Sequence, residues 1–85
     1  MPYYAYIIIS SKTGNYYFGH CENLTARICR HNSGNVKSTK YRRPWTIHHF
    51  EEFVSKSEAF KREQFFKSFK GRKWLYEKEI LKRTD

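Results

Sequence analysis

An arginine and a histidine four positions apart are the first residues in this sequence whose types suggest chemistry. Arg27 and His31 fall in a segment whose pattern predicts a helix, and residues four apart on a helix share a face. Leu24 and Ile28 fall on the same face, where a purely structural helix would normally carry four apolar residues. The aromatic segment 16–19 ends in glycine just before this helix. A guanidinium and an imidazole beside a tyrosine suit chemistry on a phosphate.

Two tyrosines of the predicted strands are the next candidates. Tyr6 and Tyr17 lie on strands expected to form a hairpin, where tyrosine is more often an ordinary core aromatic. A tyrosine hydroxyl has a pKa of about 10 and is a poor base unless nearby cations lower that pKa. Arg27 and His31 are cations of that kind, so the alternative is that both hydroxyls belong to one site with Arg27.

A carboxylate on the inward face of a later helix is the third candidate. Glu63 falls within the arc bounded by Phe60 and Phe69, at about 100° per residue. An inward carboxylate needs a partner that offsets its desolvation. A divalent metal could supply this, and so could an ion pair with Arg27 or a hydrogen bond from a tyrosine. The pattern favours neither the metal nor the structural interpretation.

Basic residues interleaved with aromatic ones occupy the predicted loop 35–44. Lysine and arginine can bind phosphates, and an exposed aromatic ring can stack on an unpaired base. The predicted nucleic-acid contacts are Lys37, Lys40, Arg42 and Arg43 in the loop, with Lys67 and Lys70 of a later helix extending the same surface. Trp45, which follows the loop, is expected to pack in the core.

The remaining potential metal ligands do not form a recognisable site. His48 and His49 are adjacent on a predicted strand, so their rings are expected on opposite faces. Cys21 and Cys29 are the only cysteines, and their spacing fits no usual zinc framework. Two such cysteines are typical of a reduced, intracellular protein.

The elements that position these residues are predicted in the order β-β-α-β-α-α. We expect strands at residues Tyr3–Ser10, 16–20 and Trp45–Phe53, and helices at 24–32, 56–69 and 72–83. A turn around Gly14 makes the first two strands an antiparallel hairpin. The fold class is therefore α+β, with a small three-stranded antiparallel sheet flanked by helices.

Local signals predict where the helices begin and end. Asn23 is the expected N-cap of the first helix, and Gly34 is its expected left-handed C-cap. Ser55 and Glu58 form a capping box at the start of the second helix. Residues 70–71 are expected to separate the second helix from the third.

Composition limits the functional classes. The 85 residues suffice for one domain, residues 1–85, and carry 17 Lys and Arg against 8 Asp and Glu, a net charge of +9. This excess favours a polyanionic partner, with nucleic acid ahead of an anionic membrane surface. A soluble basic surface without a partner is the alternative. No apolar run is long enough for a signal peptide or membrane span, so a cytoplasmic location is expected.

Several of these segments, taken in order, resemble the GIY-YIG nuclease superfamily, and in particular its small stand-alone branch. The family's Gly-Ile-Tyr appears as residues 4–6, Tyr-Ala-Tyr, and its Tyr-Ile-Gly appears as residues 17–19, Tyr-Phe-Gly. The family pattern that follows is intact as Leu24, Arg27, His31 and Asn32. Residues 38–45 and 57–63 are also typical of the small branch. The resemblance covers about residues 3–75.

The resemblance implies metal-dependent hydrolysis of DNA phosphodiester bonds, in DNA repair or processing. By position, Glu63 would hold Mg²⁺ or Mn²⁺, and Arg27 would bind the scissile phosphate. Tyr17 would orient or deprotonate the attacking water, supported by Tyr6. His31 would either take the proton from Tyr17 or act directly as the base, and the sequence does not choose between these roles.

Departures from the family pattern keep other interpretations open. The first signature lacks its glycine and isoleucine, and Cys21 stands where Ser or Thr is usual. A module that binds nucleic acid without cleaving it would need only the basic loop and helix. A protein-interaction domain would instead use exposed aromatics such as Trp74 and Tyr76.

Overall fold

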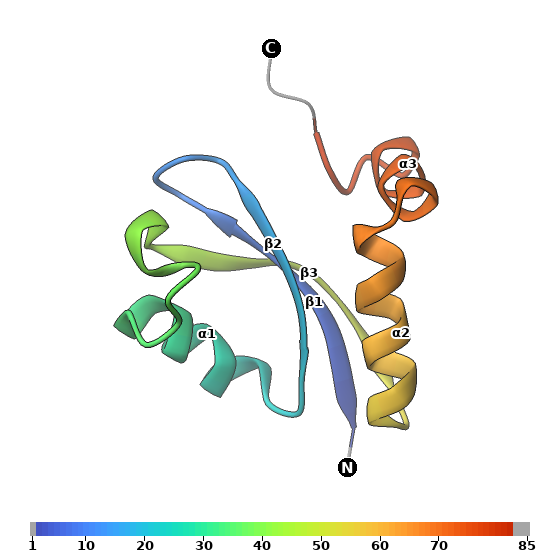
Figure 1. Cartoon of the computed structure of the whole chain (residues 1–85), viewed down its shortest axis with the longest axis horizontal. Helices are drawn as coiled ribbons and strands as arrows, with labels where there is room; N and C mark the ends of the chain where they lie inside the picture. The colour runs from blue at the N-terminus through green and yellow to red at the C-terminus, as the bar shows by residue number, and fades with distance from the viewer. Residues whose placement is uncertain (1, 83–85) are drawn as a thin grey trace.

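A three-stranded antiparallel sheet lies at the centre of the molecule, with helices on both of its faces (Figure 1). The computed structural model describes residues 2–82. The strands are β1 (Tyr3–Ser10), β2 (Tyr16–Cys21) and β3 (Trp45–Phe53), in the spatial order β2-β1-β3. The helices are α1 (Leu24–Ser33), the short 3₁₀ helix η1 (Lys40–Arg42), α2 (Lys56–Lys67) and α3 (Phe69–Glu77). The predicted α+β class and element order are confirmed.

The central strand β1 divides the core into two halves because its side chains alternate between the faces. Tyr6 and Ile8 point to the face covered by α1, where they pack with Trp45. Ala5 and Ile7 point to the opposite face, which α2 and α3 cover. Trp45 is 1% exposed, so its predicted place in the core is confirmed. The sheet therefore separates groups carried by α1 from groups carried by α2.

The predicted caps of α1 and α2 are present. The Asn23 side chain accepts a hydrogen bond from the Ala26 amide at 2.9 Å, and Gly34 adopts a left-handed conformation with φ 85°. The Ser55 hydroxyl accepts from the Glu58 amide at 3.2 Å and donates to its carboxylate at 3.0 Å. Because these hydrogen bonds are local, the residue types alone were enough to predict where both helices begin.

The break between α2 and α3 lies at Ser68, so the predicted interruption at residues 70–71 is wrong. Ser68 is extended, and its hydroxyl caps α3 by accepting from the Gly71 amide at 3.0 Å. Gly71 is buried inside α3, where a Cβ atom would lie only 1.6 Å from the Phe65 carbonyl oxygen. The glycine therefore allows α3 to approach the end of α2 closely, and the serine turns the chain.

The third helix ends at Glu77, well before the predicted end at residue 83. Glu79 has φ 60°, and the amides of Ile80 and Leu81 both bond to the Leu75 carbonyl, at 2.9 and 3.2 Å. This turn folds the chain back and buries Leu81 in the core. The tertiary burial of one leucine thus outweighs the helical pattern of the sequence. Residues 83–85 lie outside the described residues.

A bulge in β3 places the adjacent histidines on the same side of the sheet. The pairing with β1 skips His48 between Ile47 and His49, which adds one residue to β3. The His49 ring lies 6.1 Å from the Phe66 ring, and the His48 ring lies 5.2 Å from the Tyr16 ring. Both partners belong to the core on the α2 side. The prediction that the rings point to opposite faces is therefore wrong.

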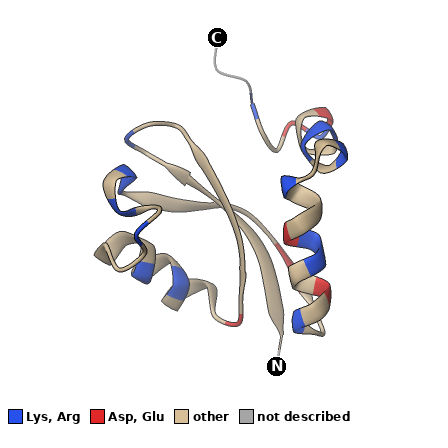
Figure 2. Ribbon diagram, viewed as in Figure 1, with Lys and Arg blue, Asp and Glu red and all other residues tan. Residues whose placement is uncertain are grey.

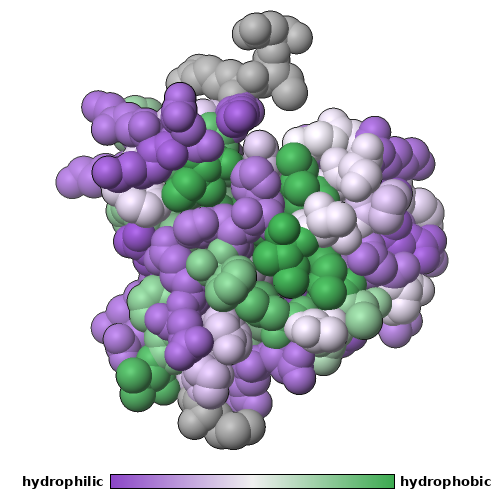
Figure 3. All heavy atoms as spheres, turned by 180° about the vertical axis from the view of Figure 1, so that it is seen from behind, coloured by the Kyte–Doolittle hydropathy of each residue, from purple (hydrophilic) through white to green (hydrophobic). Residues whose placement is uncertain are grey.

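The surface carries several exposed apolar side chains, but the two aromatics expected there are not among them. Trp74 and Tyr76 are half-buried, and the Arg62 guanidinium lies 4.8 Å from the Trp74 ring centre. Figure 3 shows hydrophobic residues reaching the surface between hydrophilic regions on one face. The exposed large apolar residues are Tyr41, Ile47, Phe50, Val54, Phe60 and Phe69. No helix within residues 2–82 has both the length and the apolar character needed to cross a membrane.

Candidate active site

A buried chain of hydrogen bonds runs from β1 through α1 to the following loop. The Tyr6 hydroxyl lies 3.1 Å from His31 Nε2, and His31 Nδ1 lies 2.8 Å from the Thr39 hydroxyl oxygen. The Thr39 hydroxyl donates to the Val36 carbonyl at 3.3 Å. Because Thr39 uses its own proton there, it accepts from Nδ1–H, and His31 Nε2 is left to accept the Tyr6 proton. The chain fixes one tautomer of the histidine.

Burial keeps both ends of the Tyr6–His31 hydrogen bond uncharged. Desolvation, with the charges of Arg27 and Arg30 acting in the same direction, lowers the pKa of His31 to about 4. Desolvation raises the pKa of Tyr6 to about 12, although the Arg27 guanidinium opposes this rise. At neutral pH the pair is therefore a neutral phenol donating to a neutral imidazole, which is the arrangement needed before a proton moves to the imidazole.

The second tyrosine contacts the histidine through its ring. The Tyr17 ring lies edge-on to His31, with 5.2 Å between centroids, and also contacts Trp45 at 6.3 Å. Tyr17 is half-buried. The structure therefore brings Tyr6, Tyr17 and His31 together, with the direct hydrogen bond to His31 made by Tyr6.

Glycine at position 19 makes room for the Tyr6 hydroxyl. Gly19 pairs with Tyr6 across the sheet, and a Cβ atom there would lie 2.4 Å from the hydroxyl oxygen. A contact that short does not occur between real atoms, so any side chain at this position would displace the phenol. The glycine of the second signature thus protects the Tyr6–His31 geometry.

The carboxylate of Glu63 lies on the other face of the sheet from these groups, because α2 covers the face opposite α1. Its side chain is 9% exposed, as the inward prediction required. Oε1 lies 2.6 Å from His20 Nδ1, and Oε2 lies 2.7 Å from Lys67 Nζ. The alternative in which Glu63 pairs with Arg27 or a tyrosine is therefore wrong, because the sheet stands between α1 and α2.

An open cleft along the edge strand β2 connects the two faces. It has a volume of about 400 Å³ and is lined by residues of β2, α1 and the start of α2. Arg27 and Arg30 line it from α1, Lys56 lines it from α2, and His20 lines it from β2. His20 therefore lines the cleft and also bonds to Glu63. Three cationic side chains around one cleft suit an anionic ligand.

The carboxylate of Glu63 offers the oxygen ligands that Mg²⁺ prefers, but it lacks the further protein ligands that would complete a coordination shell. Within residues 2–82, no three His, Cys, Asp or Glu side chains gather closely enough to hold an ion by themselves. Magnesium is commonly bound through one or two carboxylates, with water and substrate phosphates completing the shell. Each oxygen of Glu63 accepts one hydrogen bond and keeps a further lone pair. The residues present fit this open mode of binding.

The predicted nucleic-acid contacts divide into free and engaged side chains. Lys37 and Lys40 are exposed on the loop between α1 and β3. Arg42 donates to the Ser38 carbonyl at 2.6 Å, and Arg43 donates to the Lys40 carbonyl at 2.7 Å, so both arginines also hold the loop together. Figure 2 shows cationic residues on α1, on this loop and on α2 and α3. The loop surface is therefore basic but partly self-bonded.

The two predicted lysines at the end of α2 and the start of α3 differ in the same way. Lys67 is paired with Glu63, whereas Lys70 is exposed and has no acidic partner among residues 2–82. The structure therefore separates a lysine that neutralises the site from one that faces solvent.

Three residues of the site were not singled out from the sequence for their present roles. Thr39 orients His31, and His20 bonds to Glu63. The Asn32 side chain donates to the Trp45 carbonyl at 2.9 Å and accepts from its amide at 2.6 Å, which fixes the end of α1 against β3. Asn32 and Thr39 lie in segments that the family resemblance covers, but the residue types alone do not show these contacts.

Comparisons with known proteins agree with the resemblance. A family model described as the GIY-YIG catalytic domain matches residues 2–79. A UPF0213 protein of Staphylococcus saprophyticus is 42% identical over 74 residues, which span 86% of this chain and 89% of the relative. A UPF0213 protein of Halobacterium salinarum is 42% identical over 57 residues, spanning 66% of this chain and 74% of the relative.

A solved structure supports the same relationship. The solution NMR structure of a UPF0213 protein from Bacillus halodurans is similar to this chain with a TM-score of 0.52 and 32% sequence identity. The match covers 91% of this chain and 84% of the NMR chain. Sequence and fold therefore point to the same group of small proteins.

Proposed function

This chain belongs to the GIY-YIG family, and on that premise we propose that it is a single-domain endonuclease that hydrolyses DNA phosphodiester bonds with Mg²⁺ or Mn²⁺. We place its biological role in DNA repair or processing. The observation that carries the proposal is the bond from the Tyr6 hydroxyl to a neutral His31 whose tautomer Thr39 fixes. A buried proton acceptor of this kind is what the activation of a water nucleophile requires.

The proton route proposed here runs through Tyr6. A water molecule beside the Tyr6 hydroxyl passes its proton to the phenol oxygen as the phenol proton moves to His31 Nε2. Tyr6 need not ionise, which agrees with its pKa of about 12. The family resemblance implied that His31 takes the proton from Tyr17 or acts directly as the base. The route proposed here keeps a tyrosine as the relay, but the relay is Tyr6, which is the tyrosine bonded to His31. Tyr17 contacts the imidazole edge and limits the position of the water.

Substrate binding would make His31 a stronger base. Arg27 and Arg30 line the cleft, and their charges contribute to the low pKa of His31. A phosphodiester bound by these arginines would neutralise their charges, and its own negative charge favours protonated imidazole. The pKa of His31 is therefore expected to rise when the substrate binds, which couples activation of the base to the presence of the phosphate. Arg27 would bind the scissile phosphate through its guanidinium fork.

Glu63 would hold the metal ion, with His20 fixing one of its oxygens. A bound divalent ion supplies charge stabilisation for the developing phosphorane and the leaving oxygen. The exposed residues Lys37, Lys40 and Lys70, together with the loop arginines Arg42 and Arg43, would contact phosphates away from the reacting bond.

Cleavage of labelled branched, duplex and single-stranded DNA tests the proposal. Wild type is expected to cut at least one of these with Mg²⁺ or Mn²⁺, and Glu63→Ala and His31→Gln are expected to lose that activity while remaining folded. Lys78→Ala, an exposed residue outside the site, is the matched control for purification and contaminants.

The pattern of results separates the proposal from its alternative. If wild type binds DNA in a salt-sensitive manner but cuts none of the substrates, the chain is a nucleic-acid-binding module on the same fold. If wild type and Glu63→Ala cut equally, the metal assignment is wrong.

A further inference from the structure

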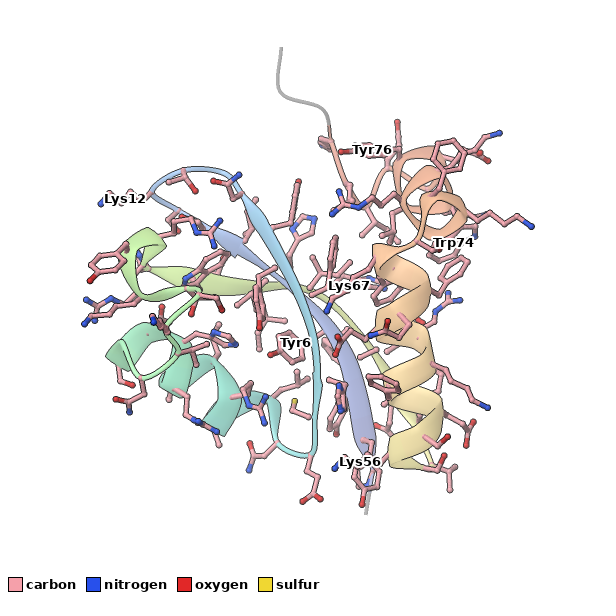
Figure 4. All side chains as sticks on the ribbon, in the orientation of Figure 1. Tyr6, Lys12, Lys56, Lys67, Trp74 and Tyr76 are labelled. Carbon is pink, nitrogen blue, oxygen red and sulfur yellow. The ribbon has the colours of Figure 1, made fainter. Side chains whose placement is uncertain are left out.

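The two oxygens of Glu63 are held by partners of different accessibility. His20, on Oε1, has a side chain that is 25% exposed and lies edge-on to Phe60 at 5.3 Å. Lys67, on Oε2, has a side chain that is 47% exposed. The imidazole is confined by strand β2 and a neighbouring ring, whereas the lysine stem projects from the last turn of α2 (Figure 4). The lysine is therefore the more exposed of the two partners and can leave Glu63 with less rearrangement of its surroundings.

The pairing of Glu63 with Lys67 also has a clear electrostatic purpose. A carboxylate that is 9% exposed needs a neighbouring cation, because desolvation penalises its charge. A glutamate four residues before a lysine is the favourable orientation on a helix. The ammonium at 2.7 Å therefore neutralises Glu63, and its positive charge opposes the binding of a divalent cation to the same carboxylate.

We propose that Lys67 is a place-holding cation that couples metal binding to nucleic-acid binding. In the free protein its ammonium neutralises Glu63, and when a divalent ion binds this carboxylate the ammonium would move to a phosphate of the nucleic acid. This inference rests on the proposed function, since it needs the metal at Glu63. Lys67 acts here as a positioning residue through Glu63, with no part in the bond-breaking step.

The exchange implies cooperativity between the two ligands. A phosphate near Lys67 gives the ammonium another anion, so it lowers the cost of displacing the lysine from Glu63. Metal binding frees the ammonium for the phosphate in return. By linkage, the factor by which DNA raises metal affinity equals the factor by which metal raises DNA affinity.

Metal affinity measured without DNA gives the first test. Mn²⁺ binding to the full chain is followed by electron paramagnetic resonance for wild type, Lys67→Gln, Lys67→Arg and Lys61→Gln. Lys67→Gln is expected to bind Mn²⁺ roughly fivefold more tightly, because the competing ion pair is gone. Lys67→Arg keeps the charge and is expected to stay near wild type. Lys61→Gln removes an equal charge from an exposed lysine of the same helix that has no acidic partner among residues 2–82, and is also expected to stay near wild type.

The second measurement adds DNA. The titrations are repeated with a short phosphorothioate duplex, which is charged but cleaved slowly, and Mn²⁺ bound by the duplex alone is subtracted. Wild type and Lys61→Gln are expected to gain metal affinity on binding DNA, and Lys67→Gln is expected to gain little. Circular dichroism melts of each variant confirm that it is folded.

Glu63→Gln separates failure of this inference from failure of the proposed function. If Glu63→Gln loses Mn²⁺ but Lys67→Gln behaves like Lys61→Gln in both titrations, the inference about Lys67 is wrong and the metal site at Glu63 is retained. If wild type and Glu63→Gln bind Mn²⁺ equally, the metal site of the proposed function fails, and this inference fails with it.

Discussion

Protonation of His31 should destabilise this protein in acid. Burial holds the pKa of His31 at about 4 in the folded chain, against 6.5 for an unperturbed histidine. The unfolded state therefore binds more protons than the folded state between these values, and stability falls as pH decreases from about 6.5 towards 4. Linkage predicts a loss of about 2 kcal/mol by pH 5 and about 3 kcal/mol near pH 4.

Urea unfolding at a series of pH values measures this loss, and His31→Gln isolates it. The variant keeps His20, His48, His49 and Glu51, so their contributions cancel in the difference between the two proteins. Wild type is expected to be the more stable protein at pH 7, because the variant disrupts the bonds to Tyr6 and Thr39. The difference in free energy of unfolding between wild type and His31→Gln should shrink by about 2 kcal/mol between pH 7 and pH 5, which is the amount that linkage assigns to this one histidine.

Parallel pH profiles would refute the reasoning. If wild type and His31→Gln lose stability equally over this range, the imidazole is not held neutral by burial, and the proposed proton route loses its acceptor. His48→Gln, which alters an exposed histidine, should retain the acid dependence of wild type. Imidazole ¹⁵N chemical shifts give an independent check, because they report the neutral Nδ1–H tautomer directly.

Three further perturbations test other contacts. Thr39→Val should lower the free energy of unfolding in urea by about 1–3 kcal/mol, because it leaves His31 Nδ1–H without its acceptor. Thr39→Val should also lower the cleavage rate more than Thr39→Ser does. Equal cleavage rates for the two variants would exclude the orienting role of Thr39. Gly71→Ala should lower stability by about 2 kcal/mol or more, since its Cβ would overlap the Phe65 carbonyl; an unchanged melting temperature would contradict this packing. Replacing Lys37 and Lys40 by Gln should weaken binding to DNA of every sequence, and should reduce the slope of log affinity against log salt concentration by about 2. An unchanged slope, measured by fluorescence anisotropy, would show that the loop is not part of the interface.

The local framework of the site follows from short-range patterns. Strands β1 and β3 have the predicted limits, because β-branched and aromatic runs with turn residues at their ends act over a few residues. The caps at Asn23 and Ser55 are equally local, and they fix the phase of each helix. That phase is enough to place Arg27 beside His31 and to turn Glu63 inward.

Tertiary structure decided what these side chains contact. The Tyr6–His31 bond joins residues 25 positions apart, and the His20–Glu63 bond joins residues 43 positions apart. The periodicity of a single helix or strand cannot predict such contacts, because they depend on the strand order and on which face of the sheet each helix covers. The sheet lies between α1 and α2 and separates Arg27 from Glu63, so the cation that pairs with Glu63 is Lys67.

The same physics explains the wrong predictions in the chain's path. The bulge at His48 and the break at Ser68 arise because packing against β1 and Phe65 outweighs the regular pattern of each element. Residue types and spacing thus determined which elements form and which groups they carry. Only the packing of those elements, which brings distant residues within hydrogen-bonding distance, decided how the groups work together.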